Sequence, residues 1–282
     1  MEPLELLKPI IQAANAANAE VPGDFVDDDG LLCCGRCHTP KQSRKALMGK
    51  EVIVGCMCDC SEAKWKQEKM DKEKQDEADR IMRQRNTGIS NISLRNASFA
   101  ADDGKNPAFM AKLRNYVENW AEMKKSNTGL LLYGDTGTGK SYGAACIANA
   151  LIEQHIPACM INLSTILNDL GGYHIEDKNA YIANLMRYHL LIIDDFGMER
   201  QTEYALEQVF NIIDARCRTG MPLIITTNLT VAEIQNPQDM AHKRIYDRID
   251  EMCLPIMATG HSRRKEKAAE KVRIAANLLL GG

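Results

Sequence analysis

The sequence predicts an α/β fold, in which a three-layer domain with a parallel five-stranded sheet follows a small cysteine-rich module. The first observation is that apolar runs of strand length alternate with segments of helical periodicity over the second part of the 282-residue chain. Strands that alternate with helices are typical of a parallel sheet covered on both faces. The second observation is that six of the ten cysteines lie between Cys33 and Cys60. We expect strands at residues 130–133, 158–163, 190–194, 223–227 and 254–257, and a helix over residues 107–124.

A glycine-rich loop follows the first of these strands and precedes a segment with a helical pattern, residues 141–152. The loop fits the pattern G-x-x-x-x-G-K-[ST], in which successive backbone N–H groups point at phosphate oxygens and the helix adds its positive dipole end. Lys140 is expected to reach the β- and γ-phosphates of ATP, and the Ser141 hydroxyl is expected to hold Mg²⁺. The expected nucleotide-binding residues are Gly134, Asp135, Thr136, Gly137, Thr138, Gly139, Lys140 and Ser141.

Two carboxylates end the buried strand at residues 190–193. Such a pair is costly unless a cation lies beside it, and Mg²⁺ at the phosphate loop would be that cation. Asp194 would then hold the ion through its water shell, and Asp195 would polarise the attacking water. Asn228, which follows the strand at residues 223–227, would lie beside the γ-phosphate and could orient water.

Two arginine groups complete the pattern, at residues 244–248 and 261–265. The phosphate loop, Leu-Leu-Ile-Ile-Asp-Asp-Phe-Gly, Ile-Ile-Thr-Thr-Asn, Arg-Ile-Tyr-Asp-Arg and Ser-Arg-Arg occur in the order seen in AAA+ ATPases, a type of P-loop NTPase. More narrowly, residues 99–276 resemble the bacterial and phage helicase loaders of the DnaC/DnaI type.

The resemblance assigns roles to arginines. By position, Arg248 matches an arginine finger that acts on the nucleotide of a neighbouring subunit. Arg264 matches the second sensor arginine, which acts on the nucleotide of its own subunit, although the register between Arg263 and Arg264 stays open. Many AAA+ proteins have Glu where Asp195 stands, and the shorter side chain suits slow hydrolysis.

The resemblance also implies a function. Helicase loaders of this type are ring-forming ATPases that deliver a hexameric replicative DNA helicase of the DnaB type onto single-stranded DNA. The implied partners are therefore that helicase, single-stranded DNA and further copies of this chain in a ring or spiral, with a hexamer expected. DNA contacts are expected from residues 164–188 or from basic residues near them.

The cysteine cluster is interpreted as a zinc-ribbon-like site, because a tight cluster in a cytosolic chain is more typical of metal binding than of disulfides. Cys34 and Cys37 form a C-x-x-C knuckle, and a strand over residues 52–54 would build a β-hairpin. Four thiolates would surround Zn²⁺ as a tetrahedron. Cys56, Cys58 and Cys60 compete for the two remaining positions. The alternative is that these cysteines are free thiols. A redox-active C-x-x-C is disfavoured, because no strand–helix pattern of the thioredoxin type surrounds it.

Three segments are expected along the chain. Residues 1–60 would contain a short amphipathic helix and the zinc-binding module, which the resemblance implies docks on the helicase. Residues 61–95 carry mixed charges at helical spacing and would form a charged linker helix, and residues 96–282 would form the ATPase domain. The formal net charge of −3 gives no global basic field. With no signal peptide and no apolar stretch near about 20 residues, a cytoplasmic protein without membrane contact is expected.

Two alternatives stay open. A transposition helper ATPase of the IstB type shares almost every motif of the ATPase domain, but it usually lacks a cysteine knuckle module. The other alternative is a nucleotide-gated adaptor that binds ATP without hydrolysing it, because Asp195 is short.

Overall fold

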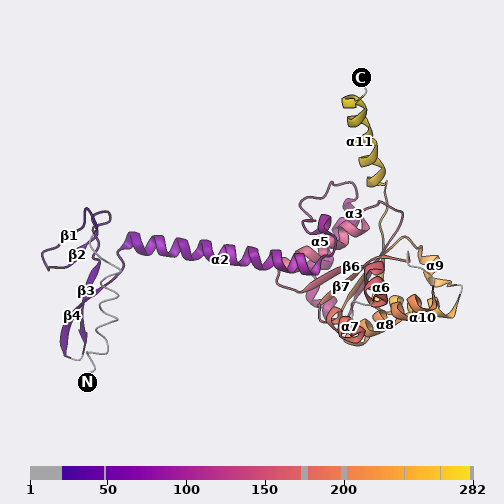
Figure 1. Ribbon diagram of the computed structural model, residues 1–282, viewed down its shortest axis with the longest axis horizontal. Coiled ribbons are helices and arrows are strands. Elements are labelled where there is room, and N and C mark those ends of the chain that lie inside the picture. The colour runs from indigo at the N-terminus through magenta and orange to yellow at the C-terminus, as the bar shows by residue number, and fades with distance from the viewer. Residues whose placement is uncertain are drawn as a thin grey trace. The chain divides into compact units, whose positions relative to one another are not determined.

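The computed structural model describes residues 21–47, 49–172, 177–197, 202–237, 239–260 and 262–279. The chain divides into two compact units, Met1–Asp79 and Arg80–Gly282 (Figure 1). This division falls inside the segment expected as a charged linker. The amphipathic helix expected within residues 1–20 lies outside the described residues.

Two antiparallel hairpins form the N-terminal unit. Strand β1 (Phe25–Val26) pairs with β2 (Leu32–Cys33), and β3 (Gln42–Leu47) pairs with β4 (Lys50–Gly55). The strand expected at residues 52–54 lies within β4. The buried apolar side chains among the described residues of this unit are Leu32, Cys33, Cys34 and Cys58.

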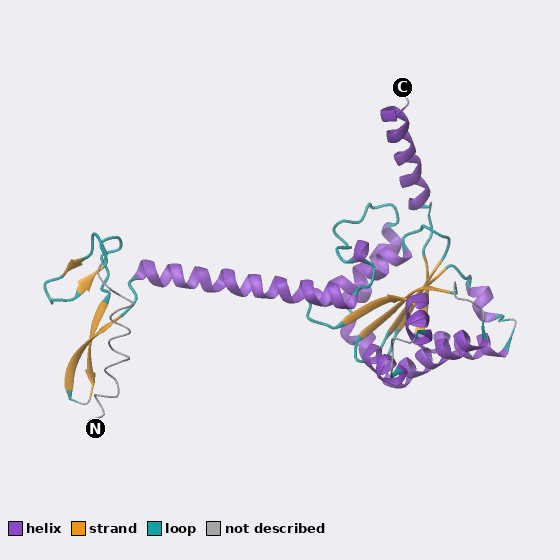
Figure 2. Ribbon diagram, in the orientation of Figure 1, coloured by secondary structure: helices purple, strands orange, loops and turns teal. Residues whose placement is uncertain are grey.

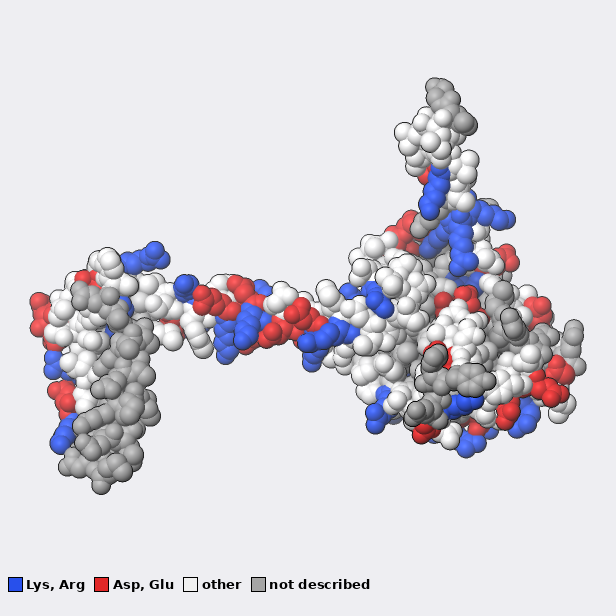
Figure 3. All heavy atoms as spheres, in the orientation of Figure 1, with Lys and Arg blue, Asp and Glu red and all other residues white. Residues whose placement is uncertain are grey.

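Helix α2 (Asp59–Gly88) contributes residues to both units and contains the expected charged segment. Figure 3 shows both signs of charge interspersed along it, and pairs spaced four residues apart, such as Lys66 with Glu62 at 2.6 Å, explain how a helix this polar is stabilised. Its last turns, from Arg80 onward, belong to the second unit and pack there. A Cβ at Gly88 would lie 2.4 Å from the carbonyl oxygen of Ala158, so only glycine permits this approach.

A parallel five-stranded sheet organises the second unit, as predicted. The strand order is β6-β7-β8-β5-β9, and every neighbouring pair is parallel. All carboxyl ends therefore lie at one edge of the sheet, where ligands bind in open α/β folds. The strands are β5 (Gly129–Tyr133), β6 (Ala158–Asn162), β7 (Leu190–Phe196), β8 (Leu223–Thr227) and β9 (Cys253–Met257).

Alternate residues of the strands face two separate apolar clusters, so the sheet is the middle of three layers (Figure 2). Leu130 and Leu132 pack with helices on one face, and Leu131 packs with helices on the other. The first helical layer contains α3 (Pro107–Glu118), α4 (Trp120–Lys125) and α5 (Lys140–Glu153). The second contains α6 (Leu163–Gly171), α8 (Glu203–Thr219) and α10 (Met240–Met252).

Shorter or peripheral elements complete the unit. They are η1 (Ile92–Leu94), α7 (Lys178–Met186), α9 (Val231–Gln235) and α11 (Arg263–Leu279). The single helix expected over residues 107–124 is instead two helices, because Asn119 departs from helical geometry at φ −101° and ψ 21°. No helix of the described chain is both long and apolar enough to cross a membrane.

A fully buried arginine ties the second helical layer to the opposite edge of the sheet. Arg216 on α8 donates from Nη1 to the carbonyl oxygen of Tyr188 at 2.8 Å and from Nη2 to those of His189 at 2.9 Å and Pro222 at 2.7 Å. These carbonyls precede β7 and β8. Burial lowers the pKa of Arg216 to about 10, so the side chain is still charged at neutral pH.

Candidate functional site

The phosphate loop joins β5 to α5 and depends on three glycines with positive φ. Gly134, Gly137 and Gly139 have φ angles of 136°, 87° and 98°. A Cβ at Gly134 would lie 2.4 Å from the carbonyl oxygen of Ala258, and one at Gly137 would lie 2.3 Å from Ser262 Oγ. The loop can therefore take this shape only with glycine at these positions.

Lys140 is the first residue of α5, and its ammonium group is fully engaged. Its Nζ donates to the carbonyl oxygens of Gly134 at 2.7 Å and Asp135 at 2.8 Å, and to Asn228 Oδ1 at 2.8 Å. Burial lowers the pKa of Lys140, and the nearby carboxylates of Asp195 and Asp135 oppose that shift. The structure thus brings together the cation of the loop and the amide at the end of β8.

Asp194 lies at the carboxyl end of β7 beside the start of α5. Thr226 donates from Oγ1 to Asp194 Oδ1 at 2.5 Å, and the Ser141 side chain also hydrogen-bonds to this carboxylate. Burial raises the pKa of Asp194, and the bonds from Thr226 and Ser141 oppose that rise. Mg²⁺ prefers oxygen ligands, and the Ser141 hydroxyl and the Asp194 carboxylate are oxygen groups in contact with each other. These two side chains therefore fit the ion.

Asp195 has a strained backbone, with φ 56°, at an irregularity in the pairing of β7 and β8 between Ile193 and Phe196. Its N–H donates to Thr226 Oγ1 at 3.0 Å, and Asn162 Nδ2 donates to its Oδ2 at 3.2 Å. Asn162 and Thr226 were not among the predicted site residues. Their signal was available, because both are polar residues at the carboxyl ends of strands next to β7.

Lys140, Asp194, Asp195 and Asn228 line one cleft with a volume of about 470 Å³. Predicted residues on its wall are Thr136, Gly137, Gly139, Lys140, Ser141, Asp194, Asp195, Asn228 and Arg264. Another part of the wall comes from a segment that carries no motif and was not predicted. Its residues include Asn91, Ser93, Leu94, Ala101 and Asp103.

Both arginines of the Ser-Arg-Arg group reach this cleft, but Arg263 lies against the phosphate loop. Its N–H donates to the carbonyl oxygen of Gly137 at 3.0 Å, and its Nη1 would lie 2.8 Å from a Cβ at Gly139. Its side chain is only 16% exposed. Arg264, the residue assigned from the sequence, is exposed, and its charge helps to lower the pKa of Lys140.

Arg248 does not line the cleft of its own chain. It lies on α10, where Nη1 pairs with Glu251 Oε2 at 2.8 Å and Nη2 pairs with Asp214 Oδ1 at 3.4 Å. With 42% of its side chain exposed, it is accessible to another molecule. Its role as a finger for a neighbouring subunit stays a prediction.

The N-terminal unit gathers four cysteines. The Sγ atoms of Cys34, Cys37, Cys58 and Cys60 all lie within 4.8 Å of one another. Tetrahedral Zn–S bonds of about 2.3 Å would place sulfurs about 3.8 Å apart. The distances of 3.6 Å from Cys34 to Cys60 and 3.4 Å from Cys58 to Cys60 are close to that value, so the group fits Zn²⁺.

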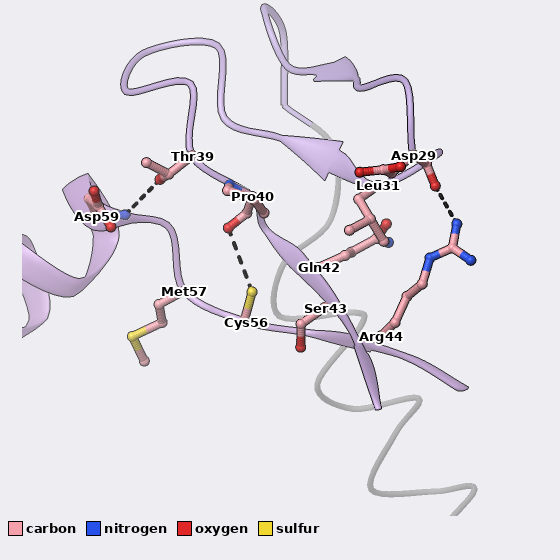
Figure 4. A pocket seen from close by; sticks show the side chains of 10 residues that line it. All are labelled: Asp29, Leu31, Thr39, Pro40, Gln42, Ser43, Arg44, Cys56, Met57 and Asp59. Carbon is pink, nitrogen blue, oxygen red and sulfur yellow. Dashed lines mark hydrogen bonds between the residues drawn. The ribbon is translucent and has the colours of Figure 1, made fainter. Parts of the chain in front are cut away.

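Cys56 is outside this group, so of the three cysteines that the sequence left competing for two positions, the geometry favours Cys58 and Cys60. Its thiol donates to the carbonyl oxygen of Pro40 at 3.6 Å and lines a separate hollow of about 710 Å³ (Figure 4). Cys56 directly follows β4, and its thiol is directed toward Pro40 instead of toward the other cysteines.

Hydroxyl groups support the four-cysteine cluster. Thr39 Oγ1 lies 3.1 Å from Cys37 Sγ and also accepts the N–H of Asp59 at 3.0 Å. The Thr39 hydroxyl is the main cause that lowers the pKa of Cys37 to about 5, and Ser61 similarly lowers the pKa of Cys58. These bonds favour the thiolate, the form that binds metals, at Cys37 and Cys58, whereas the bond to Cys58 is the main cause that raises the pKa of Cys60 to about 12.

A buried ion pair fixes the first knuckle. Asp24 accepts the N–H of Gly35 at 3.0 Å and the Nζ of Lys41 at 2.7 Å. The bond from Lys41 is the main cause that lowers the pKa of Asp24 to about 2. Gly35 lies between Cys34 and Cys37, so this pair holds the backbone that positions both thiols.

Comparisons with known proteins agree with the fold and the phosphate loop. A family model described as IstB-like ATP binding protein matches residues 60–271. An ATP-binding protein in an insertion sequence of Mycobacterium tuberculosis is 27% identical over 201 residues, which cover 67% of this chain and 78% of that protein. The replicative helicase loader DnaI of Bacillus subtilis is 24% identical over 188 residues, or 61% of this chain and 59% of the loader. The replicative helicase loader DnaC of Escherichia coli K12 is 25% identical over 143 residues, which cover 50% of this chain and 56% of that loader.

Solved structures give the same fold. The crystal structure of DnaI matches with a TM-score of 0.53 and 25% identity, and it covers 64% of this chain and 100% of that chain. The crystal structure of the DnaC helicase loader matches with a TM-score of 0.50 and 22% identity over 60% of this chain and 100% of that chain. The chain therefore has a P-loop fold of AAA+ type, while it spans less than two thirds of the full length of the two curated loaders.

Proposed function

The chain belongs to the IstB-like ATP binding protein family, and on this basis we propose that it hydrolyses ATP to load a replicative DNA helicase onto single-stranded DNA. The observation that carries the proposal is the cleft in which Lys140, Asn228, Asp194 and Asp195 converge. The names of two relatives, both replicative helicase loaders, support the choice of task.

The phosphates of ATP would lie on the loop that begins at Gly134, whose glycines leave room for them. Lys140 would exchange its bonds to loop carbonyls for the β- and γ-phosphates. Mg²⁺ held by Ser141 and Asp194 would neutralise charge on these phosphates. Burial lowers the pKa of Lys140, while the carboxylates of Asp195 and Asp135 favour its charged form.

Hydrolysis would need an oriented water. Its oxygen forms a bond to the γ-phosphorus, and the bridging oxygen leaves with ADP and keeps the bonding electrons. The water proton moves toward Asp195, which Asn162 and the backbone contact to Thr226 hold in place. Asn228 can position the water from the other side, because its Oδ1 already meets Lys140.

Arg248 would complete the site of a neighbouring copy of the chain. It lies outside its own cleft and is exposed on α10, as a finger supplied in trans requires. ATP would then favour a ring or spiral, with a hexamer as the expected form. The N-terminal unit, organised by Zn²⁺ at Cys34, Cys37, Cys58 and Cys60, would dock on the helicase.

The test replaces the loop lysine. Lys140→Ala should weaken ATP binding by about a hundredfold, because a buried charge-assisted contact to phosphate is lost. Lys112→Ala, an exposed change on α3, is the matched control. ATP binding is measured by titration calorimetry, and loading by the amount of hexameric helicase retained on single-stranded DNA. Retained ATP affinity in Lys140→Ala would reject the nucleotide site.

A second function, help in transposition, is favoured by the relative encoded in an insertion sequence. Comparing phosphate release with single-stranded DNA plus helicase and with duplex DNA separates the two. Stimulation only by duplex DNA would favour the transposition helper. No phosphate release above that of Lys140→Ala with any partner would favour the nucleotide-gated adaptor.

A further inference from the structure

Arg263 lies beside the phosphate loop, yet its guanidinium is already paired with two carboxylates. Its Nη2 is 2.9 Å from Asp103 Oδ1 and 3.6 Å from Asp102 Oδ1. Both aspartates belong to the loop between η1 and α3, which forms one wall of the cleft. A guanidinium binds carboxylates and phosphates with the same set of N–H donors, so the two kinds of partner can compete for it.

Asp102 depends on this arginine. Its side chain is 11% exposed, and Oδ2 accepts the N–H of Gly104 at 3.2 Å. Oδ1 is buried and has no hydrogen-bond partner among the described residues. A buried carboxylate oxygen without a hydrogen bond is costly, and the nearby charge of Arg263 offsets part of that cost.

The loop that contains Asp102 and Asp103 is also hydrogen-bonded to the segment just before Arg263. Asn106 Nδ2 donates to the carbonyl oxygen of Thr259 at 2.6 Å, and the N–H of Arg263 donates to Gly137. Hydrogen bonds at Thr259 and Arg263 therefore connect the aspartate loop and the phosphate loop to the same segment. A ligand that moves the guanidinium of Arg263 changes the support of Asp102 directly.

We propose that Asp102 and Asp103 form an acidic latch that competes with the phosphates of the nucleotide for Arg263. The latch rests on the proposed function, because it requires nucleotide in the cleft. The Arg263 guanidinium lies beside Gly139 of the phosphate loop. Its N–H groups are therefore within reach of a phosphate bound on this loop. When phosphate takes this cation, the two carboxylates lose it, and residues 99–105 are released from the wall of the cleft. Release of this loop is then a signal that nucleotide is bound.

The first test neutralises the latch in the full chain. The double variant Asp102→Asn with Asp103→Asn should bind ATP about fivefold more tightly or better, because Arg263 is freed from its competitors. The control is Glu118→Gln with Glu122→Gln, two exposed changes in α3 and α4 that alter the net charge by the same amount as the latch variant. It should leave the affinity for ATP unchanged. Unchanged or weaker ATP binding by the double variant would overturn the latch. Asp103→Asn alone, at a 40% exposed side chain, serves if the double variant does not fold.

A double-mutant cycle distinguishes competition for Arg263 from simple repulsion between carboxylates and phosphates. In an Arg263→Gln background the latch has no cation to hold, so neutralising both aspartates should change ATP affinity by about twofold or less. A gain of the same size as in the wild-type background would mean repulsion alone and would refute the latch.

Amide hydrogen exchange gives an independent readout. ATP should slow exchange in the phosphate loop at residues 134–141 while it speeds exchange at residues 99–105. Protection of residues 99–105 by ATP would contradict their release. If ATP binds neither the wild-type chain nor the double variant, the proposed function itself fails, whereas normal ATP binding without faster loop exchange rejects the latch alone.

Discussion

The two units of this chain are stabilised in different ways. In the second unit, a parallel sheet separates two large apolar clusters, and the buried surface of many side chains stabilises the fold. In the N-terminal unit, the described buried apolar residues are a leucine and three cysteines. A unit this small cannot bury enough apolar surface to fold by that means alone, so specific bonds must replace it.

The two units are therefore vulnerable to different substitutions. A substitution in the sheet removes one of many contacts and has a graded effect. Removing one partner of the thiol cluster removes most of what holds the N-terminal unit. The following experiments test this contrast, beginning with the largest expected effect.

Metal removal should unfold the N-terminal unit and leave the second unit folded. Binding of structural Zn²⁺ is worth on the order of 10 kcal/mol, more than a small module can lose. Chelation, or Cys37→Ser, should abolish the dispersed NMR amide signals of residues 21–58 and reduce zinc from one ion per chain to none. The melting temperature of the second unit should not change. A folded N-terminal unit without metal would break the comparison.

Arg216→Met should lower the free energy of unfolding of the second unit by about 3 kcal/mol, because buried carbonyls lose their donors. The two tryptophans allow a clean measurement, since Trp65 lies in the N-terminal unit and Trp120 is buried in the second. In a Trp65→Phe background, urea unfolding followed by Trp120 fluorescence reports the second unit.

The matched control for Arg216 is Arg218→Met on the same helix. Its side chain is 79% exposed and pairs with Asp214, so the expected loss is below about 1 kcal/mol. Equal losses for the two arginines would mean that the buried guanidinium contributes nothing beyond an ordinary surface pair.

Thr39→Val should weaken zinc binding about tenfold without unfolding the unit at saturating zinc. Valine keeps the shape of threonine but removes the hydroxyl that meets Cys37 and accepts the N–H of Asp59. Competition with a chromogenic chelator measures the affinity. Thr87→Val, at the far end of α2, is the isosteric control, and equal zinc affinity in both variants would exclude support by the Thr39 hydroxyl.

The sheet and phosphate loop could be predicted from the sequence because their signals are local. An apolar run, a glycine pattern and a terminal carboxylate pair each lie within a few residues, and parallel strands bring such ends to one edge. Contacts between distant segments left no such signal. Asp102 and Asp103 look like any acidic loop until the fold places them beside Arg263. Arg216 likewise sits in a helix where arginine is usually exposed, and only the packed structure buries it.

The sequence also could not decide which of three neighbouring cysteines stays off the metal, although they lie within five residues of one another. C-x-C-x-C spacing makes Cys56, Cys58 and Cys60 equivalent in sequence, and the direction of each thiol depends on where β4 ends and α2 begins. The hairpin register pairs Gln42 with Gly55 and so brings Cys56 beside Pro40.

Cys56→Ser should therefore have the smallest effect of this series. Its thiol lies 3.6 Å from the Pro40 carbonyl oxygen, a weak bond that a serine hydroxyl can replace, so zinc content and melting behaviour should stay within error of the wild type. Cys58→Ser is the matched comparison two residues away, with a buried thiol inside the cluster, and it should lose the metal and the fold of the unit. Zinc loss in Cys56→Ser with zinc retained in Cys58→Ser would reverse the ligand assignment.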